Sequence, residues 1–84
     1  MRLLLQQRPD GREAPRFVRL QLQPDLLGGW ELLRETGQTG GRSTLRRELH
    51  PDQASAMAAL EAARDQQLTR GFQLVFAQGA DAPR

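Results

Sequence analysis

The chain has 84 residues, with 12 basic and 10 acidic side chains and a formal net charge of +2. This length corresponds to one small domain, which buries roughly 60% of its unfolded surface and has no room for an enzyme cleft between two lobes. The chain contains no cysteine, which excludes disulfides, thiolate catalysis and cysteine-ligated zinc.

The N-terminal quarter predicts strands joined by a loop. Residues 2–7 read as a short strand, whose three consecutive leucines are too few for a signal peptide or a membrane helix, so we expect a cytoplasmic protein. Residues 8–15 contain two prolines, one glycine and four charged residues, which predicts an exposed loop. In residues 16–23 three apolar side chains alternate with Arg and Gln, the period of a strand with one solvated face: Val18, Leu20 and Leu22.

The middle of the chain predicts a turn at residues 24–29, a second central strand at 30–35 and a third strand at 43–50. Leu45 and Leu49 share one face of that third strand. Residues 34–44 contain three glycines and predict a turn between the two strands. The single tryptophan, Trp30, is assigned to the core or the sheet rim, since aromatic residues in strands usually pack; a stacking platform for a base is the functional alternative.

The C-terminal part predicts one helix over residues 51–71 and a last strand over 72–76. Pro51 suits the first helical position, Asp52 the positive N-terminal end and Gly71 the C-terminal cap. The expected apolar stripe consists of Met57, Leu60 and Leu68, flanked by Ala54 and Ala63, with Arg64 near its middle. Phe72, Leu74 and Phe76 are expected on one face of the last strand. The predicted fold class is α+β: a small antiparallel β-sheet of four to five strands packed against one α-helix, with a domain over 1–76 and a flexible tail over 77–84.

Catalytic and cofactor motifs are not apparent. The sequence around Gly41, Arg42 and Ser43 departs from a phosphate-binding P-loop, because Arg replaces the lysine and a strand follows where a helix is needed. His50 is the only histidine, so no second histidine can complete a metal site. We therefore expect no enzyme, no metal and no small-molecule cofactor.

Two segments resemble, in their residues and their order, the WGR domain, a module of poly(ADP-ribose) polymerases and of small bacterial proteins. They are "PRFVRLQLQPDLLGGWELLRETGQTGGR" and "HPDQASAMAAL", with "TRGF" closing the helix. The resemblance spans about residues 1–72 and implies a small antiparallel sheet with one helix. The Trp-Gly-Arg of the family falls on Thr36-Gly37-Gln38, so only the glycine is kept. In polymerase members this Trp packs at a DNA end; Thr36 cannot stack and Gln38 carries no charge. We expect the tripeptide to form a tight exposed turn in which Gly37 has a positive φ.

Two functions are compatible with these observations. In the first, a WGR-like module binds nucleic acid weakly and without sequence specificity, through arginine contacts to phosphates. The candidate site residues are Arg34, Thr36, Gly37, Gln38, Arg42, Arg46 and Arg47. In the second, the DNA contact is lost and the chain is a protein-interaction or assembly module, with a homodimer through an edge strand as one form of it. Arginines converging on one open face favour nucleic acid, whereas pairing with Glu31, Glu35 and Glu48 does not.

Overall fold

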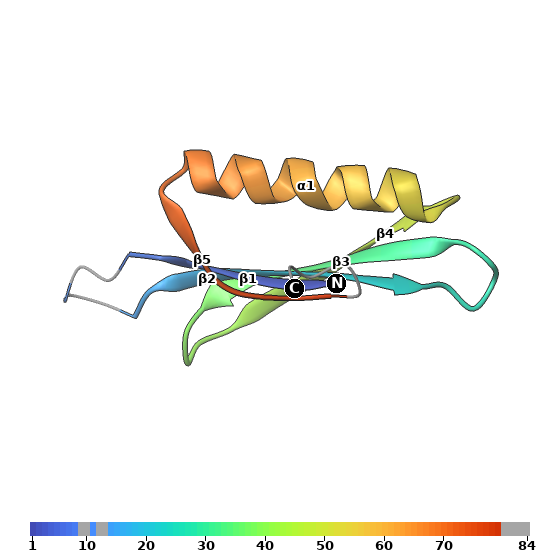
Figure 1. Cartoon of the computed structure of the whole chain (residues 1–84). Coiled ribbons are helices and arrows are strands. Elements are labelled where there is room, and N and C mark those ends of the chain that lie inside the picture. The colour runs from blue at the N-terminus through green and yellow to red at the C-terminus, as the bar shows by residue number, and fades with distance from the viewer. Residues whose placement is uncertain (9–10, 12–13, 80–84) are drawn as a thin grey trace.

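The computed structural model describes residues 1–8, 11 and 14–79, which form one sheet and one helix (Figure 1). The strands are β1 (Arg2–Gln7), β2 (Arg16–Pro24), β3 (Trp30–Gln38), β4 (Ser43–His50) and β5 (Phe72–Gln78), and the helix is α1 (Gln53–Thr69). The strand order is β4-β3-β2-β1-β5, and all neighbouring strands are antiparallel. The predicted α+β class is confirmed.

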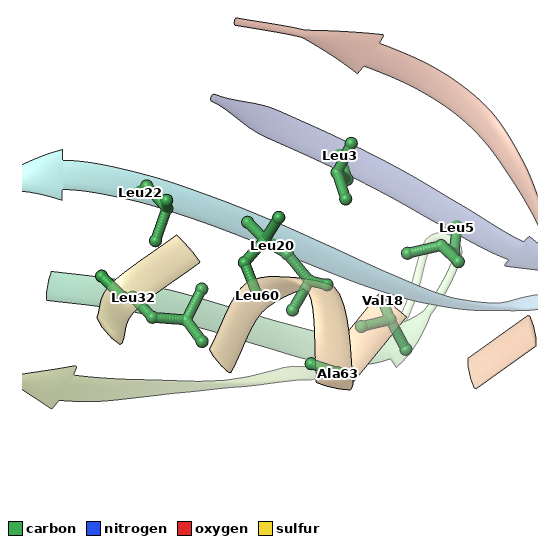
Figure 2. Close-up of a cluster of buried hydrophobic side chains, with 9 residues drawn as sticks. Leu3, Leu5, Val18, Leu20, Leu22, Leu32, Leu60 and Ala63 are labelled. Carbon is green, nitrogen blue, oxygen red and sulfur yellow. The ribbon is translucent and has the colours of Figure 1, made fainter. Parts of the chain in front are cut away.

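The helix α1 covers one face of the sheet and leaves the other without a covering element in the described part of the chain (Figure 1). We call these the covered face and the open face. The core lies between α1 and the covered face, where the alternating residues of β1, β2 and β3 meet Leu60 and Ala63 (Figure 2). Its sheet members are Leu3, Leu5, Val18, Leu20, Leu22 and Leu32. The predicted inward face of residues 16–23 is therefore confirmed, and Trp30 packs against the edge of this core.

The helix begins two residues later than predicted. Asp52 is the N-cap: its carboxylate accepts a hydrogen bond from the Ser55 amide at 2.8 Å, which lowers the pKa of Asp52 because the bond favours the charged form. Pro51 thus lies before the cap and not at the first helical position. At the other end Gly71 follows the cap residue with a φ of +93°, which fits the predicted glycine stop.

The buried stripe of α1 is also different from the predicted one. It consists of Ala56, Leu60, Ala63 and Gln67, while Leu68 is 43% exposed and Ala54 is exposed. Two of the four buried residues are alanines, whose small side chains let the helix backbone lie close to the sheet. The prediction placed Met57, Leu60 and Leu68 on one side of the helix; Leu60 is in the core and Met57 packs against it, but the prediction is wrong for Leu68.

Strand β5 pairs with β1 through an irregular register. Leu5 lies opposite Leu74, but Leu4 lies opposite Phe76, so one extra residue is inserted between the two pairs. Such a bulge reverses the side-chain alternation beyond it. Phe72 and Leu74 are on the covered face and Phe76 on the open face, which corrects the prediction that all three share a face.

Two predicted boundaries change. Strand β3 continues to Gln38, and β5 continues to Gln78, two residues into the predicted tail. Much of the predicted 8–15 loop and the end of that tail lie outside the described residues. Within the described ranges no helix is long and apolar enough to cross a membrane.

Candidate functional site

The four candidate arginines do not form one cluster. Arg46 and Arg47 are consecutive in β4, so their side chains point to opposite faces of the sheet. Arg46 pairs in register with Arg34 on the side of the covered face, and Arg47 lies on the open face opposite Leu33. Arg42 is in the turn that precedes β4. A single arginine surface, the expectation for a nucleic-acid site, is therefore not what this fold presents.

Arg47 is bound to an acid of the neighbouring strand. Its Nε and Nη2 atoms donate to Oε2 of Glu31 at 3.2 and 2.7 Å. The Glu31 side chain is only 4% exposed, and Gln23 donates a further hydrogen bond to it. The hydrogen bonds from Arg47 and then Gln23 lower the pKa of Glu31, and the same contact raises the pKa of Arg47. Arg47 is thus held over β3 as the counter-ion of a buried carboxylate.

Two more cross-strand ion pairs follow the same pattern. Arg34 lies 3.6 Å from Glu48, which also contacts His50 at 2.9 Å. Arg19 on β2 contacts Glu35 at 2.7 Å. All three acids named in the sequence analysis as competitors for the arginines therefore have an arginine partner.

Arg42 and Arg46 differ from these residues. Neither has a carboxylate within 4.0 Å among the residues that the structure describes, and both are exposed. They are the two candidate cations whose charge an external group can still meet.

The tripeptide Thr36-Gly37-Gln38 is in β3 and not in a turn, which corrects the prediction of a tight exposed turn. The connection to β4 comes after it, and there Gly40 has the positive φ, +79°. Gly37 itself is buried and outside the positive-φ region. A Cβ at this position would lie 2.5 Å from the carbonyl oxygen of Arg42, so glycine is needed for the close approach of the two strands.

The two neighbours of Gly37 point to the covered side. Thr36 lines a cavity of about 260 Å³ at the end of α1, together with Gln67 and Arg70. The side-chain amide Nε2 of Gln38 donates a hydrogen bond to the carbonyl oxygen of Ala14 at 2.8 Å. This bond joins the end of β3 to the segment that leads into β2. Thr36 and Gln38 have structural contacts within the fold; they lie on the same side of the sheet as Arg34 and Arg46, while Arg47 lies on the other.

The open face combines apolar and charged side chains. Hollows in it share Arg19 as a lining residue; their other walls include Leu33 and Leu45, Leu4 and Phe76, and Phe17. The guanidinium of Arg19 lies 5.8 Å from the centre of the Phe17 ring, a cation–π contact. The prediction that Leu45 and Leu49 share a face is confirmed; the sequence alone did not show that the face is the uncovered one.

Strand β4 is an edge strand, and no other strand of the described residues pairs with its outer side. Every residue from Ser43 to Leu49 is exposed, and the exposed fractions of Leu45 and Leu49 reach 61% and 66%. Its pairing with β3 runs from Ser43 to His50 without a bulge. The opposite edge, β5, contains the bulge described above. Regular edge strands with exposed apolar residues are templates for pairing with another chain.

The described residues contain no group of three or more histidine, aspartate or glutamate side chains placed to hold a metal ion. Comparison of the chain with family models, with curated proteins and with solved structures gave no match. The resemblance to the WGR domain stays a prediction from the sequence.

Proposed function

We propose that this chain is a non-catalytic protein-interaction module whose interface is the outer edge of β4 with the adjoining open face. The observation that carries the proposal is the state of β4: two exposed leucines on a regular edge that no strand of residues 1–8, 11 and 14–79 pairs with on its outer side. Adding a strand there would satisfy the outward backbone N–H and C=O groups of β4 and bury both leucines.

The arginine geometry supports the same choice over nucleic acid. Three acids on the strands take up arginines of the neighbouring strands, so the mild basic charge is largely compensated within the sheet. The positions equivalent to the tryptophan and arginine of the WGR tripeptide are occupied by Thr36 and Gln38, which lie away from β4's outer edge. A WGR-like domain in which the DNA contact is replaced by a protein contact agrees with both facts.

Site-specific photo-cross-linking tests this function. A photoreactive leucine analogue at position 49, in extract of the cells that produce the chain, should link to one defined protein, identified by mass spectrometry. The matched control places the analogue at Ala58, which is exposed on α1. A product at position 49 that is missing at position 58 supports the module; equal labelling at both positions contradicts it.

Nucleic-acid binding is measured on the same protein. Fluorescence anisotropy with blunt, nicked and single-stranded DNA at low and moderate salt should show no saturable binding. Salt-dependent binding that is lost when Arg42 and Arg46 are both replaced by Ala, without a cross-link at position 49, would establish the nucleic-acid function instead.

A further inference from the structure

The exposed edge of β4 has a self-complementary order of side chains. Residues 45–49 read Leu-Arg-Arg-Glu-Leu, and the central residue is Arg47. If this segment is placed beside a reversed copy of itself centred on Arg47, each leucine faces a leucine and Arg46 faces Glu48. We propose that the partner of this edge is a second copy of the same chain, paired antiparallel through β4 about a two-fold axis at Arg47. This deepens the proposed function, on which it rests.

The geometry of antiparallel strands makes this register specific. Directly opposed residues in a continuous sheet lie on the same face, so the axis must pass through a residue pair and not between two residues. With the axis at Arg47, Leu45 lies opposite the partner's Leu49 on the open face. Arg46 lies opposite the partner's Glu48 on the other face, and symmetry repeats both contacts.

Neighbouring registers are unfavourable. An axis at Arg46 places the two Arg46 side chains opposite each other, and among the residues described no carboxylate lies within 4.0 Å of Arg46. The same axis places Leu45 opposite an arginine. An axis at Glu48 opposes two glutamates and places Leu49 against an arginine. Like charges directly opposite across strands are destabilising, so the order of the charges favours the axis at Arg47 over the axes at Arg46 and at Glu48.

The chosen register also opposes two copies of Arg47, and the fold reduces this cost. Each Arg47 reaches across to Glu31 of its own β3, with Nη2 to Oε2 at 2.7 Å. Since β3 lies on the inner side of β4, this contact draws the guanidinium away from the outer edge and supplies its counter-ion. The axis is therefore occupied by two neutralised ion pairs and not by two free cations.

The covered side leaves space for the second copy. Residues 43–49 are all exposed, so α1 leaves their side chains uncovered. Glu48 already contacts Arg34 at 3.6 Å, and the partner's Arg46 would be the second arginine at this carboxylate. The result is one continuous sheet made of the five strands of each copy, with one helix over each half.

Sedimentation equilibrium with charge-swap variants tests the proposal. The wild-type chain should sediment with twice its mass of 9.4 kDa. Arg46→Glu opposes two acids and Glu48→Arg opposes two bases, so each variant should raise the dissociation constant at least tenfold. An equimolar mixture of the two variants should restore the dimer, since every Glu then faces an Arg. The double variant with both changes should also dimerise.

The matched control is Arg42→Glu, which makes the same charge change in the turn before β4 and should leave the dimer intact. A wild-type chain that stays monomeric at millimolar concentration overturns the proposal. So does a dimer that neither single variant weakens. A monomeric wild type whose position 49 cross-links to a different protein leaves the proposed function standing and rejects self-pairing.

Cysteine pairing provides a second measurement that does not depend on the charge variants. The chain has no cysteine, so Leu45→Cys and Leu49→Cys each introduce a single thiol. In the proposed register, opposed Cα atoms are about 4.5–5.5 Å apart, within disulfide range, while residue 45 is about 14 Å from its own copy. A mixture of the two variants should form a disulfide-linked dimer under mild oxidation, and each variant alone should not. Equal cross-linking of the single variants would exclude this register.

Discussion

Replacing Leu20 by alanine tests the packing between sheet and helix. Leu20 is fully buried in the central strand β2, opposite Leu3 of β1 and beneath α1 (Figure 2). The change removes the equivalent of about three methylene groups, worth about 0.8 kcal/mol each. The cavity adds to this loss because neighbours on both sides are fixed by strand pairing and by the helix, so we expect about 3–4 kcal/mol, within the range for buried leucines.

This loss is a large part of the total stability. A domain of 84 residues has a free energy of unfolding of about 4–12 kcal/mol. With an m-value of about 1 kcal/mol/M in urea, the unfolding midpoint should fall by about 3 M. Fluorescence of Trp30, the only tryptophan, reports the transition because its side chain packs against the core.

Leu27→Ala is the matched control, since the same atoms are removed from a side chain that is 93% exposed in the β2–β3 turn. All proteins are compared at one concentration, because self-association adds to apparent stability. If the midpoints of the two variants differ by less than about 0.5 M, Leu20 does not face the helix as described.

Three further outcomes are expected. Gly37→Ala should lower the melting temperature more than Gly41→Ala, since a Cβ at Gly37 meets a backbone oxygen at 2.5 Å while the closest atom to one at Gly41 is at 3.4 Å; equal losses in calorimetry would refute the close-approach argument. Because the folded-state pKa of Glu31 is below its ordinary value of 4.5, its contribution to stability is present above that pH and is lost as pH falls further. Glu31→Gln should therefore flatten the dependence of the urea midpoint on pH below about 4.5; an unchanged slope would contradict this. Arg47→Ala should lower the melting temperature more than Arg42→Ala, because only the first leaves a buried carboxylate without its cation.

The sheet was largely predictable because period-two alternation is a local property. Val18, Leu20 and Leu22 alternate with polar residues, and this fixes both the strand and its inward face. The inward side of α1 was less accessible to sequence reasoning. Ala56 and Ala63 are on the buried side of α1, and alanine gives little periodic contrast on either side of an alanine-rich helix.

The bulge in β5 could not be derived from the sequence. Phe72, Leu74 and Phe76 have a regular spacing of two, and the inserted residue appears only when β5 is paired with β1. The role of Gly37 has the same origin, because the conflict with a side chain comes from the backbone of the facing strand. Both features depend on contacts between segments that are distant or turn-connected, and local pattern does not contain them.

The separation of the arginines was, in contrast, available from the sequence. Arg46 and Arg47 are adjacent in a predicted strand, and adjacent strand residues face opposite sides. Grouping them by net charge counted residues along the chain without assigning them to a face. Glu31 and Glu48 were visible in the sequence as acids. Their contacts, Glu31 with Arg47 at 2.7 Å and Glu48 with Arg34 at 3.6 Å, could be known only from the register of β3 with β4.

Because β4 is an edge strand, its charges affect which other strands can pair with it. An edge strand of alternating apolar and neutral residues could pair in many registers and would be prone to aggregation, while one with only positive residues would repel a second copy in all of them. The order Arg46, Arg47, Glu48 belongs to neither case, because an axis at Arg47 places each Arg46 opposite a Glu48, while an axis at Arg46 or at Glu48 places like charges opposite each other. The two edges then differ in a physical way: the bulge interrupts the regular register at β5, and at β4 the order of the charges favours pairing with the same strand of a second copy.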